Sequence, residues 1–280
     1  MSRPGRFRLD GNRQDGGMGN LILVRHGETE WSRDGRHTGR TDVPLTPKGE
    51  AAAKSLAPAV AKLSIIATFT SPAERAERTA QLAGLPDPTP DPDLWEWDYG
   101  GYEGRTTKEI QAERPGWNLW RDGVIPGDAQ HPGETVEQVG ERADRALARV
   151  RPLLAEGNVA LVAHGHLLRV LTARWLQLDP AAGRLFRLDT GTISELGTEH
   201  DNPVILTWNV PPTASLARRL NCSGSPLLVS RGHPLWAGPT GSAALGQLLW
   251  ADRGRVSSVI QLRYESAPRM IGMAMISGSS

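Results

Sequence analysis

Short apolar runs alternate with helix-like segments between residues 21 and 178. Residues 21–24 and 158–163 are short apolar runs typical of strands buried on both faces, and a further strand is predicted over residues 65–70. A polar or glycine-containing loop follows each run, and a helical pattern follows each loop. This repeated order predicts a three-layer α/β/α sandwich with a mostly parallel central sheet.

Helix signals lie between the predicted strands. Thr46 has the character of an N-cap, Pro47 occupies the first helical position and Glu50 is near the capping-box position, so a helix is predicted over residues 47–63. Periodic apolar positions indicate one long amphipathic helix over residues 134–155. Further helices are predicted over residues 73–83 and 167–178.

The two ends of the chain lack this pattern. Residues 1–19 are rich in Arg and Gly with little to bury, which favours a disordered leader or a translation start at Met18. Beyond Pro212 the apolar residues lose their periodicity. We therefore expect a domain over residues 20–212, followed by an irregular C-terminal extension of unknown role over residues 213–280.

Charge and composition exclude several classes of protein. The 32 Lys and Arg nearly balance 31 Asp and Glu, so no overall attraction to nucleic acid or to an anionic membrane is expected. The single cysteine excludes an internal disulfide framework. No apolar run approaches the roughly 18 residues of a spanning helix, and the N-terminus lacks a secretory apolar stretch. A cytoplasmic location is expected, and the oligomeric state stays open, with a homodimer among the options.

Candidate chemistry begins at Arg25-His26-Gly27, directly after the first predicted strand, where open α/β sheets place ligand sites. A neutral imidazole can attack phosphorus through one nitrogen while a hydrogen bond holds the other, so His26 is a candidate nucleophile. The guanidinium fork of Arg25 suits phosphate oxygens, and Gly27 lets the backbone approach a ligand closely. Without further motifs, a loop histidine and a surface arginine would be the better interpretation.

Arg75 supplies a second arginine after a different predicted strand. It lies on the opening turn of a helix and can reach the same edge of the sheet, where positive charge stabilises the oxygens of a transferring phosphoryl group. The alternative is that Arg75 and Arg78 pair with Glu74 and Glu77 on the helix surface, which fits Arg78 better.

His164 and Gly165 follow the third predicted strand and open a helix, where backbone N–H groups and the helix dipole favour an anion. His164 could donate a hydrogen bond to the phosphoryl group, with the Gly165 N–H assisting. His166 is interpreted as a neighbour of the site. A metal site joining these histidines with His26 lacks ligand spacing and an accompanying Cys or Asp cluster, so no metal and no cofactor is predicted.

Residues 94–104 combine aromatic, acidic and glycine residues, which suits a fixed pocket wall with carboxylates. Glu96 is the candidate general acid, able to give a proton to the leaving oxygen and later to take one from the attacking water. Asp98 and Glu103 are alternatives for that role. Taken alone, the segment would be interpreted as aromatic packing with solvated acids.

Together these blocks resemble the histidine phosphatase superfamily, the group that contains the phosphoglycerate mutases and many small-molecule phosphatases. The resemblance runs from residue 20 to residue 212, and residues 96–100 are most similar to acid phosphatases of this family from actinobacteria. The matching blocks are residues 25–31, Gly39 with residues 44–46, residues 71–72 with 75–76 and 79–80, Glu96 with Gly100 and residues 103–104, residues 133–135, and residues 164–165.

The resemblance implies a phosphoglycerate mutase-like fold, a phosphorylated His26 and Glu96 as the proton donor. It also implies a phosphate pocket formed by Arg25, Arg75 and His164. Thr29 and Ser32 stand where the family has a small polar residue and an asparagine that face the ligand. Ser32 therefore departs from the family pattern, as does His166, which replaces a common glycine.

The implied activity is acid phosphatase-like hydrolysis of small-molecule phosphomonoesters by a phosphoric monoester hydrolase. Mutases of the family carry a long basic insertion between the general-acid glutamate and the second histidine. Here that interval, residues 105–163, is short and its basic residues are scattered, so hydrolysis is favoured over phosphotransfer. A non-catalytic phosphate-binding module is the other alternative, and the presence of every catalytic residue type opposes it.

Substrate selectivity is expected to come from residues 106–131, which include Trp117 and Trp120 and are predicted to cover the leaving group as a lid. We expect Arg121 or Arg105 to help select anionic phosphoesters.

Overall fold

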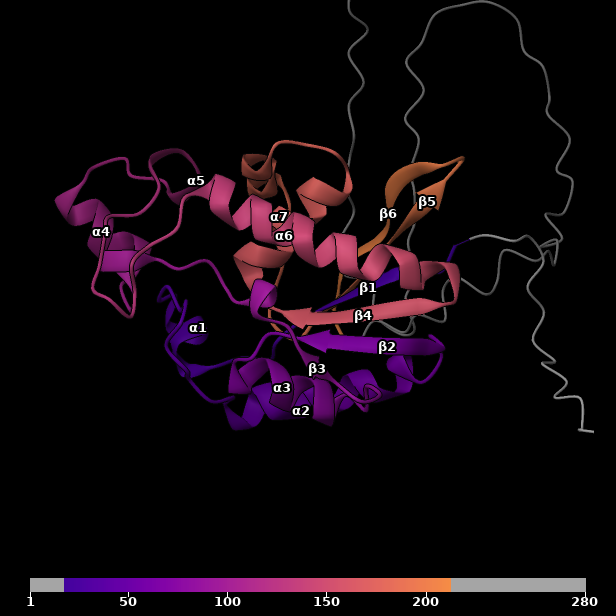
Figure 1. Ribbon diagram of the computed structural model, residues 1–280. Coiled ribbons are helices and arrows are strands. Elements are labelled where there is room, and N and C mark those ends of the chain that lie inside the picture. The colour runs from indigo at the N-terminus through magenta and orange to yellow at the C-terminus, as the bar shows by residue number, and fades with distance from the viewer. Residues whose placement is uncertain (1–17, 213–280) are drawn as a thin grey trace, which may run out of the picture. The chain divides into compact units, whose positions relative to one another are not determined.

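The computed structural model describes residues 18–212. A six-stranded sheet runs in the order β3-β2-β4-β1-β5-β6 (Figure 1). Its parallel part is formed by β1 (Leu21–Arg25), β2 (Ile65–Thr70), β3 (Thr89–Pro90) and β4 (Asn158–Ala163). The predicted strands and the mostly parallel sheet are confirmed, whereas the predictions for residues 1–17 and 213–280 lie outside the described residues.

Two antiparallel strands, β5 (Ile193–Glu199) and β6 (Asn202–Val210), complete the sheet as a hairpin beside β1. Neither strand was predicted from the sequence. Most residues of β6 are half-buried on both faces, because this strand forms the edge of the sheet, so it shows neither a continuous apolar run nor a clear alternation.

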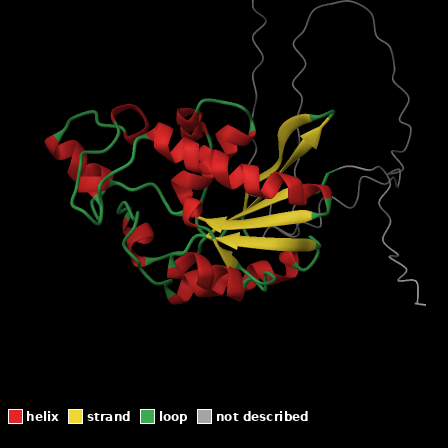
Figure 2. Cartoon of the chain, in the orientation of Figure 1, coloured by secondary structure: helices red, strands yellow, loops and turns green. Residues whose placement is uncertain are grey.

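Helices cover both faces of the sheet (Figures 1 and 2). α2 (Pro47–Val60) and α3 (Glu74–Leu82) lie on one face, and α6 (Val136–Val150) and α7 (Gly165–Trp175) lie on the other. β1 shows how the sheet fills two cores: Leu21 and Leu23 pack with the α6 and α7 side chains, whereas Ile22 and Val24 pack with those of α2 and α3. The three-layer prediction is confirmed.

The helix boundaries correct two predictions. The Thr46 hydroxyl does cap α2 by accepting a hydrogen bond from the Gly49 N–H at 3.0 Å, but Glu50 does not close a capping box and instead pairs with Arg78 of α3. The predicted single helix over residues 134–155 is wrong. α6 ends at Val150 and a 3-10 helix, Arg151–Ala155, follows, because Pro152 has no N–H with which to continue α-helical hydrogen bonding.

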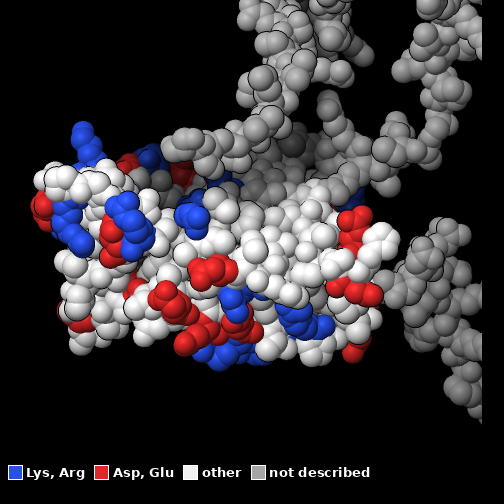
Figure 3. Space-filling model, turned by 90° about the horizontal axis from the view of Figure 1, so that it is seen from above, with Lys and Arg blue, Asp and Glu red and all other residues white. Residues whose placement is uncertain are grey.

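Three shorter helices lie at the end of the sheet to which β2 and β4 point (Figure 1): α1 (Glu30–Asp34), α4 (Thr107–Glu113) and α5 (Leu119–Asp122). Further 3-10 helices span Pro92–Leu94, Gly100–Tyr102 and Pro180–Leu185. Among the described residues, no helix has the length and apolar character needed to cross a lipid bilayer. Acidic and basic side chains are interspersed on the face shown in Figure 3.

Candidate active site

His26 follows β1 directly and is almost fully buried, with 4% of its surface exposed. Its Nδ1 lies 2.7 Å from the Gly27 carbonyl oxygen, which can only accept, so Nδ1 carries the proton and donates. Burial, followed by the charges of Arg75 and Arg25, lowers the pKa of His26 well below its ordinary value. The ring is therefore neutral near pH 7, and Nε2 holds the free lone pair that a nucleophile needs.

Arg25 presents unsatisfied donors beside His26. Its Nη1 donates to the Leu188 carbonyl, but its Nε is buried without a hydrogen-bond partner among the described residues. Gly165 packs directly on this guanidinium, since a Cβ added there would lie 3.0 Å from the Arg25 Cζ. A buried cation with an unused N–H is a strong reason to expect an anion at this place.

Gly27 has a different role from the one predicted. A Cβ on this residue would lie 2.5 Å from the Gly49 carbonyl oxygen, so the missing side chain allows α2 to approach the loop after β1. The Gly27 N–H donates to the Thr79 hydroxyl of α3 at 3.0 Å. Gly27 thus fixes the loop that carries His26 against two helices.

Arg75 is fully buried and is held from several sides. Its Nη atoms donate to the carbonyls of Thr41 and Gly39, each at 2.9 Å, and its Nε donates to His164 Nδ1 at 3.2 Å. Arg75 therefore does not pair with the glutamates of its own helix, and Asp42, at 3.6 Å, is its nearest carboxylate. Its charge is fixed close to both histidines.

His164 uses both ring nitrogens within the protein. Because a guanidinium can only donate, Nδ1 accepts from Arg75, and the neutral ring then donates from Nε2 to the Ser71 hydroxyl at 2.7 Å. Burial, followed by the charge of Arg75, lowers the pKa of His164 well below its ordinary value. The ring centroids of His164 and His26 are 5.1 Å apart. The predicted hydrogen bond from His164 to a phosphoryl group thus requires it to exchange one of these partners.

Glu96 ties its loop to the start of α7. Its Oε1 accepts hydrogen bonds from the backbone N–H groups of Trp97 and Leu167, at 2.9 and 2.8 Å, and its Oε2 accepts from that of His166 at 3.0 Å. The Glu96 carboxyl group therefore accepts the hydrogen bonds at this helix N-terminus. Among the described residues, the Gly165 N–H is left without a hydrogen-bond partner.

The two alternative acids have structural partners elsewhere. Asp98 accepts hydrogen bonds from the Gly100 and Gly133 N–H groups, and Glu103 accepts from those of Gly39 and Thr41. Of the three acids, only Glu96 lines the cavity described below.

Thr29 and Ser32 form the capping box of α1. The Thr29 hydroxyl accepts from the Ser32 N–H at 3.1 Å, and the Ser32 hydroxyl accepts from the Thr29 N–H at 2.9 Å. Thr29 is fully buried, whereas Ser32 reaches the cavity. Their predicted contacts with the ligand stay predictions.

A cavity of about 210 Å³ opens at this end of the sheet. Its lining includes Arg25, His26, Glu96 and Gly165, which were predicted from the sequence. Arg75 and His164 do not line it. The lining also contains residues that were not assigned to the site from the sequence or, for His166, were set aside as a neighbour: Arg36, His37, Tyr99, His166 and Arg169.

A signal for Arg169 was present in the sequence, because it lies one helical turn after Gly165 and His166 on α7 and so shares their face. His166 also belongs to the cavity, where its Nδ1 and the Tyr99 hydroxyl share a hydrogen bond of 2.6 Å. No comparable local signal marks Arg36, which the loop after α1 brings to the site.

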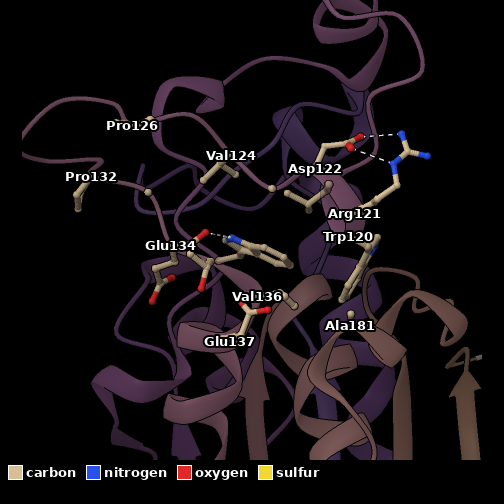
Figure 4. Close-up of a pocket in the computed structure, with 15 residues that line it drawn as sticks. Trp120, Arg121, Asp122, Val124, Pro126, Pro132, Glu134, Val136, Glu137 and Ala181 are labelled. Carbon is tan, nitrogen blue, oxygen red and sulfur yellow. Dashed lines mark hydrogen bonds and ion pairs between the residues drawn. The ribbon is translucent and has the colours of Figure 1, made fainter.

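The predicted selectivity arginines lie elsewhere. Arg105 pairs with Glu113 at 2.6 Å, and Arg121 pairs with Asp122 at 2.8 Å on the rim of a separate pocket of about 460 Å³ (Figure 4). Neither lines the catalytic cavity. Trp120 lies between the two spaces, with its ring centroid 5.4 Å from that of His166, so part of the predicted lid does border the site.

The chain belongs to the histidine phosphatase superfamily (branch 1), whose family model matches residues 21–211. It is 41% identical over 182 residues to an acid phosphatase of Mycobacterium tuberculosis, an alignment that covers 64% of this chain and 87% of the relative. It is 40% identical over 189 residues to sedoheptulose 1,7-bisphosphatase of Saccharomyces cerevisiae, covering 56% and 67%.

A solved structure of an open reading frame product from Mycobacterium tuberculosis has 38% sequence identity and a TM-score of 0.65, and the match covers 69% of this chain and 98% of that one. The family and the phosphoglycerate mutase-like fold that the sequence resembled are confirmed.

For a His26 nucleophile, as expected from the sequence, the lowered pKa predicts activity in acid. A histidine must be neutral to attack phosphorus, and a lowered pKa keeps it neutral at pH values where a free imidazole is protonated. After correction for substrate ionisation, kcat/KM for p-nitrophenyl phosphate should therefore be retained as the pH falls below the ordinary histidine pKa of about 6.5. A pH–rate profile checks this. An acidic limb centred near the ordinary histidine pKa of about 6.5 would show that His26 titrates normally.

Proposed function

We propose that this protein hydrolyses small-molecule phosphomonoesters through a phosphohistidine on His26. His26 Nε2 attacks phosphorus, the bond to the leaving oxygen breaks, and Glu96 supplies the proton to that oxygen. Water then attacks the phosphohistidine, Glu96 takes a proton from it, and inorganic phosphate leaves with neutral His26 restored. Arg25, Arg75 and the Gly165 N–H supply the positive field around the phosphoryl oxygens.

The observation that carries this proposal is the juxtaposition of His26 and Arg25. A buried, neutral imidazole with a free Nε2 lies beside a buried guanidinium whose Nε has no partner among the described residues. A phosphate ester placed here would accept the unused N–H groups and bring phosphorus to the nucleophile.

Activity should be measured with p-nitrophenyl phosphate and a panel of phosphorylated metabolites between pH 4 and 8, without added metal. Release of inorganic phosphate supports the proposal. Interconversion of phosphoglycerates without release of phosphate would instead identify a mutase, and binding of phosphate without turnover would identify a non-catalytic module.

Two further arginines that line the cavity, Arg36 and Arg169, favour substrates with a second anionic group. Arg36 donates to the Gly104 carbonyl at 2.8 Å, and Arg169 donates to the Gly183 carbonyl at 3.0 Å while stacking on Trp120. Within the described part of the chain, neither forms an ion pair with a carboxylate. Two arginines without a carboxylate partner in one small cavity suit a second phosphate or a carboxylate. The yeast relative, which is named as a bisphosphatase, is consistent with this.

Replacing Arg36 or Arg169 with glutamine should raise KM for bisphosphorylated substrates by about 10-fold, because each loses one charge-assisted contact. KM for p-nitrophenyl phosphate, which has no second anion, should change less than about 3-fold. Arg105→Gln and Arg121→Gln serve as matched controls outside the cavity. Equal changes in KM for both substrates, or equal changes in KM in the control variants, would show that Arg36 and Arg169 do not bind a second anionic group.

A further inference from the structure

Arg142 of α6 is a buried cation next to the loop that carries Glu96, and only 4% of its surface is exposed. Its Nε and Nη2 donate to the two carboxylate oxygens of Glu134 at 2.8 and 3.0 Å. Its remaining hydrogen bonds go to backbone carbonyls: Nη1 donates to Asp93 and Trp95, and Nη2 donates to Glu96 at 3.0 Å. One guanidinium thus holds three carbonyls of the segment that ends at Glu96.

Glu134 holds the same loop on the other side of Glu96. Its Oε2 accepts a hydrogen bond from the Asp98 N–H at 2.9 Å, and its carbonyl oxygen accepts from the Trp97 indole at 2.8 Å (Figure 4). The residues before and after Glu96 are therefore attached to one ion pair, in which the Arg142 and Glu134 side chains are 5% and 15% exposed. Residues 95–99 belong to no helix or strand, so no regular backbone ladder holds them.

A contribution to the stability of the fold does not by itself explain the Arg142–Glu134 ion pair. Removing two charges from water costs several kcal/mol per ion, and well-packed apolar residues of similar volume often stabilise a fold as well or better. The need to hold Glu96 in position explains it better. Proton transfer requires the acid within hydrogen-bond reach of the leaving oxygen, and a displacement of about 1 Å can cost about 100-fold in rate.

We propose that Arg142 and Glu134 are positioning residues that hold Glu96 where it can protonate the leaving oxygen. Neither side chain lines the catalytic cavity, so their effect on the reaction passes through the backbone of the Glu96 loop. This inference rests on the proposed function, because it assigns a purpose to Glu96 in phosphoester cleavage.

The test compares kcat/KM for two classes of substrate, because this ratio reports the step in which the leaving group departs. p-Nitrophenolate leaves readily without a proton, whereas an alkoxide must be protonated. Arg142→Lys and, as a second variant, Glu134→Gln should lower kcat/KM about 100-fold for an alkyl phosphate such as glycerol 3-phosphate, but less than about 10-fold for p-nitrophenyl phosphate.

The same variants in a Glu96→Gln background should cause less than a 3-fold further loss with the alkyl phosphate, because residues that act through one group are not additive. Arg174→Lys is the control, since Arg174 forms a similar paired contact with Asp144 of α6, at 3.0 Å, and its other hydrogen bond goes to the Leu178 carbonyl and not to the Glu96 loop. This control should leave the ratio between the two substrates unchanged.

Equal losses for both substrates, or a full further loss in the Glu96→Gln background, would overturn the positioning role while the proposed function stands. If Arg142→Lys does not fold, as judged by circular dichroism, Glu134→Gln decides the question alone. If the wild-type protein shows no turnover that is lost in His26→Ala, both proposals are overturned. That result is obtained before any variant of Arg142 is measured.

Discussion

Replacing His26 with alanine is expected to lower kcat for every phosphomonoester by at least about 10⁴-fold, because His26 takes the phosphoryl group in the first step. The reason lies in geometry: the His26 Nδ1 proton is bound to the Gly27 carbonyl, which leaves Nε2 free at the cavity. His164, the neighbouring imidazole, cannot replace it, because Arg75 and Ser71 already engage both of its ring nitrogens.

Steady-state release of phosphate measures this effect. His200→Asn is a suitable control, because His200 is exposed in the turn between β5 and β6 and its positive φ of 48° suits asparagine. The control should retain wild-type activity. Residual turnover above about 1% in His26→Ala, with the variant folded, would mean that water attacks the substrate directly.

Replacing Glu96 with glutamine is expected to have the second largest effect, and this effect should depend on the leaving group. Glutamine keeps the size of the side chain and one carbonyl acceptor for the N–H groups at the start of α7, but it has no carboxyl proton to give. We expect kcat/KM to fall between about 10² and 10⁴-fold for alkyl phosphates and much less for p-nitrophenyl phosphate.

A plot of log kcat/KM against the pKa of the leaving alcohol or phenol provides the measurement. The wild-type protein should show a shallow dependence, and Glu96→Gln a steep one. Parallel lines for the two proteins would exclude Glu96 as the proton donor, and Asp98 and Glu103 would then need the same test, even though both are hydrogen-bonded to backbone N–H groups away from the cavity.

The parallel core could be predicted because its signals are local. A strand buried on both faces, such as residues 158–163, leaves a run of apolar residues, and a capped helix start such as Thr46-Pro47 leaves a recognisable pair. The hairpin of β5 and β6 was missed because an edge strand with half-buried residues shows neither pattern. The end of α6 was missed because apolar residues at helical spacing continue beyond Pro152, although the α-helix does not.

Several residues of the site could be predicted for a related reason. His26, Arg75, His164 and Gly165 each follow a parallel strand, and the carboxyl ends of parallel strands meet at one edge. The partners of these residues could not be predicted, because they depend on loops. Arg105 and Arg121, which were expected to help select anionic phosphoesters, pair with carboxylates nearby in the chain and do not line the cavity. Arg36 and Arg169 line it and have no carboxylate partner among the described residues.

The most direct test of the phosphohistidine is to trap it. The protein is mixed with a phosphomonoester labelled at phosphorus, quenched in alkali at times within the first turnover, digested and analysed for the labelled peptide. We predict transient label on the peptide that contains His26, formed no later than free phosphate and absent from His26→Ala. Label on a different residue, or a complete single turnover in which the protein is never labelled, would contradict the mechanism.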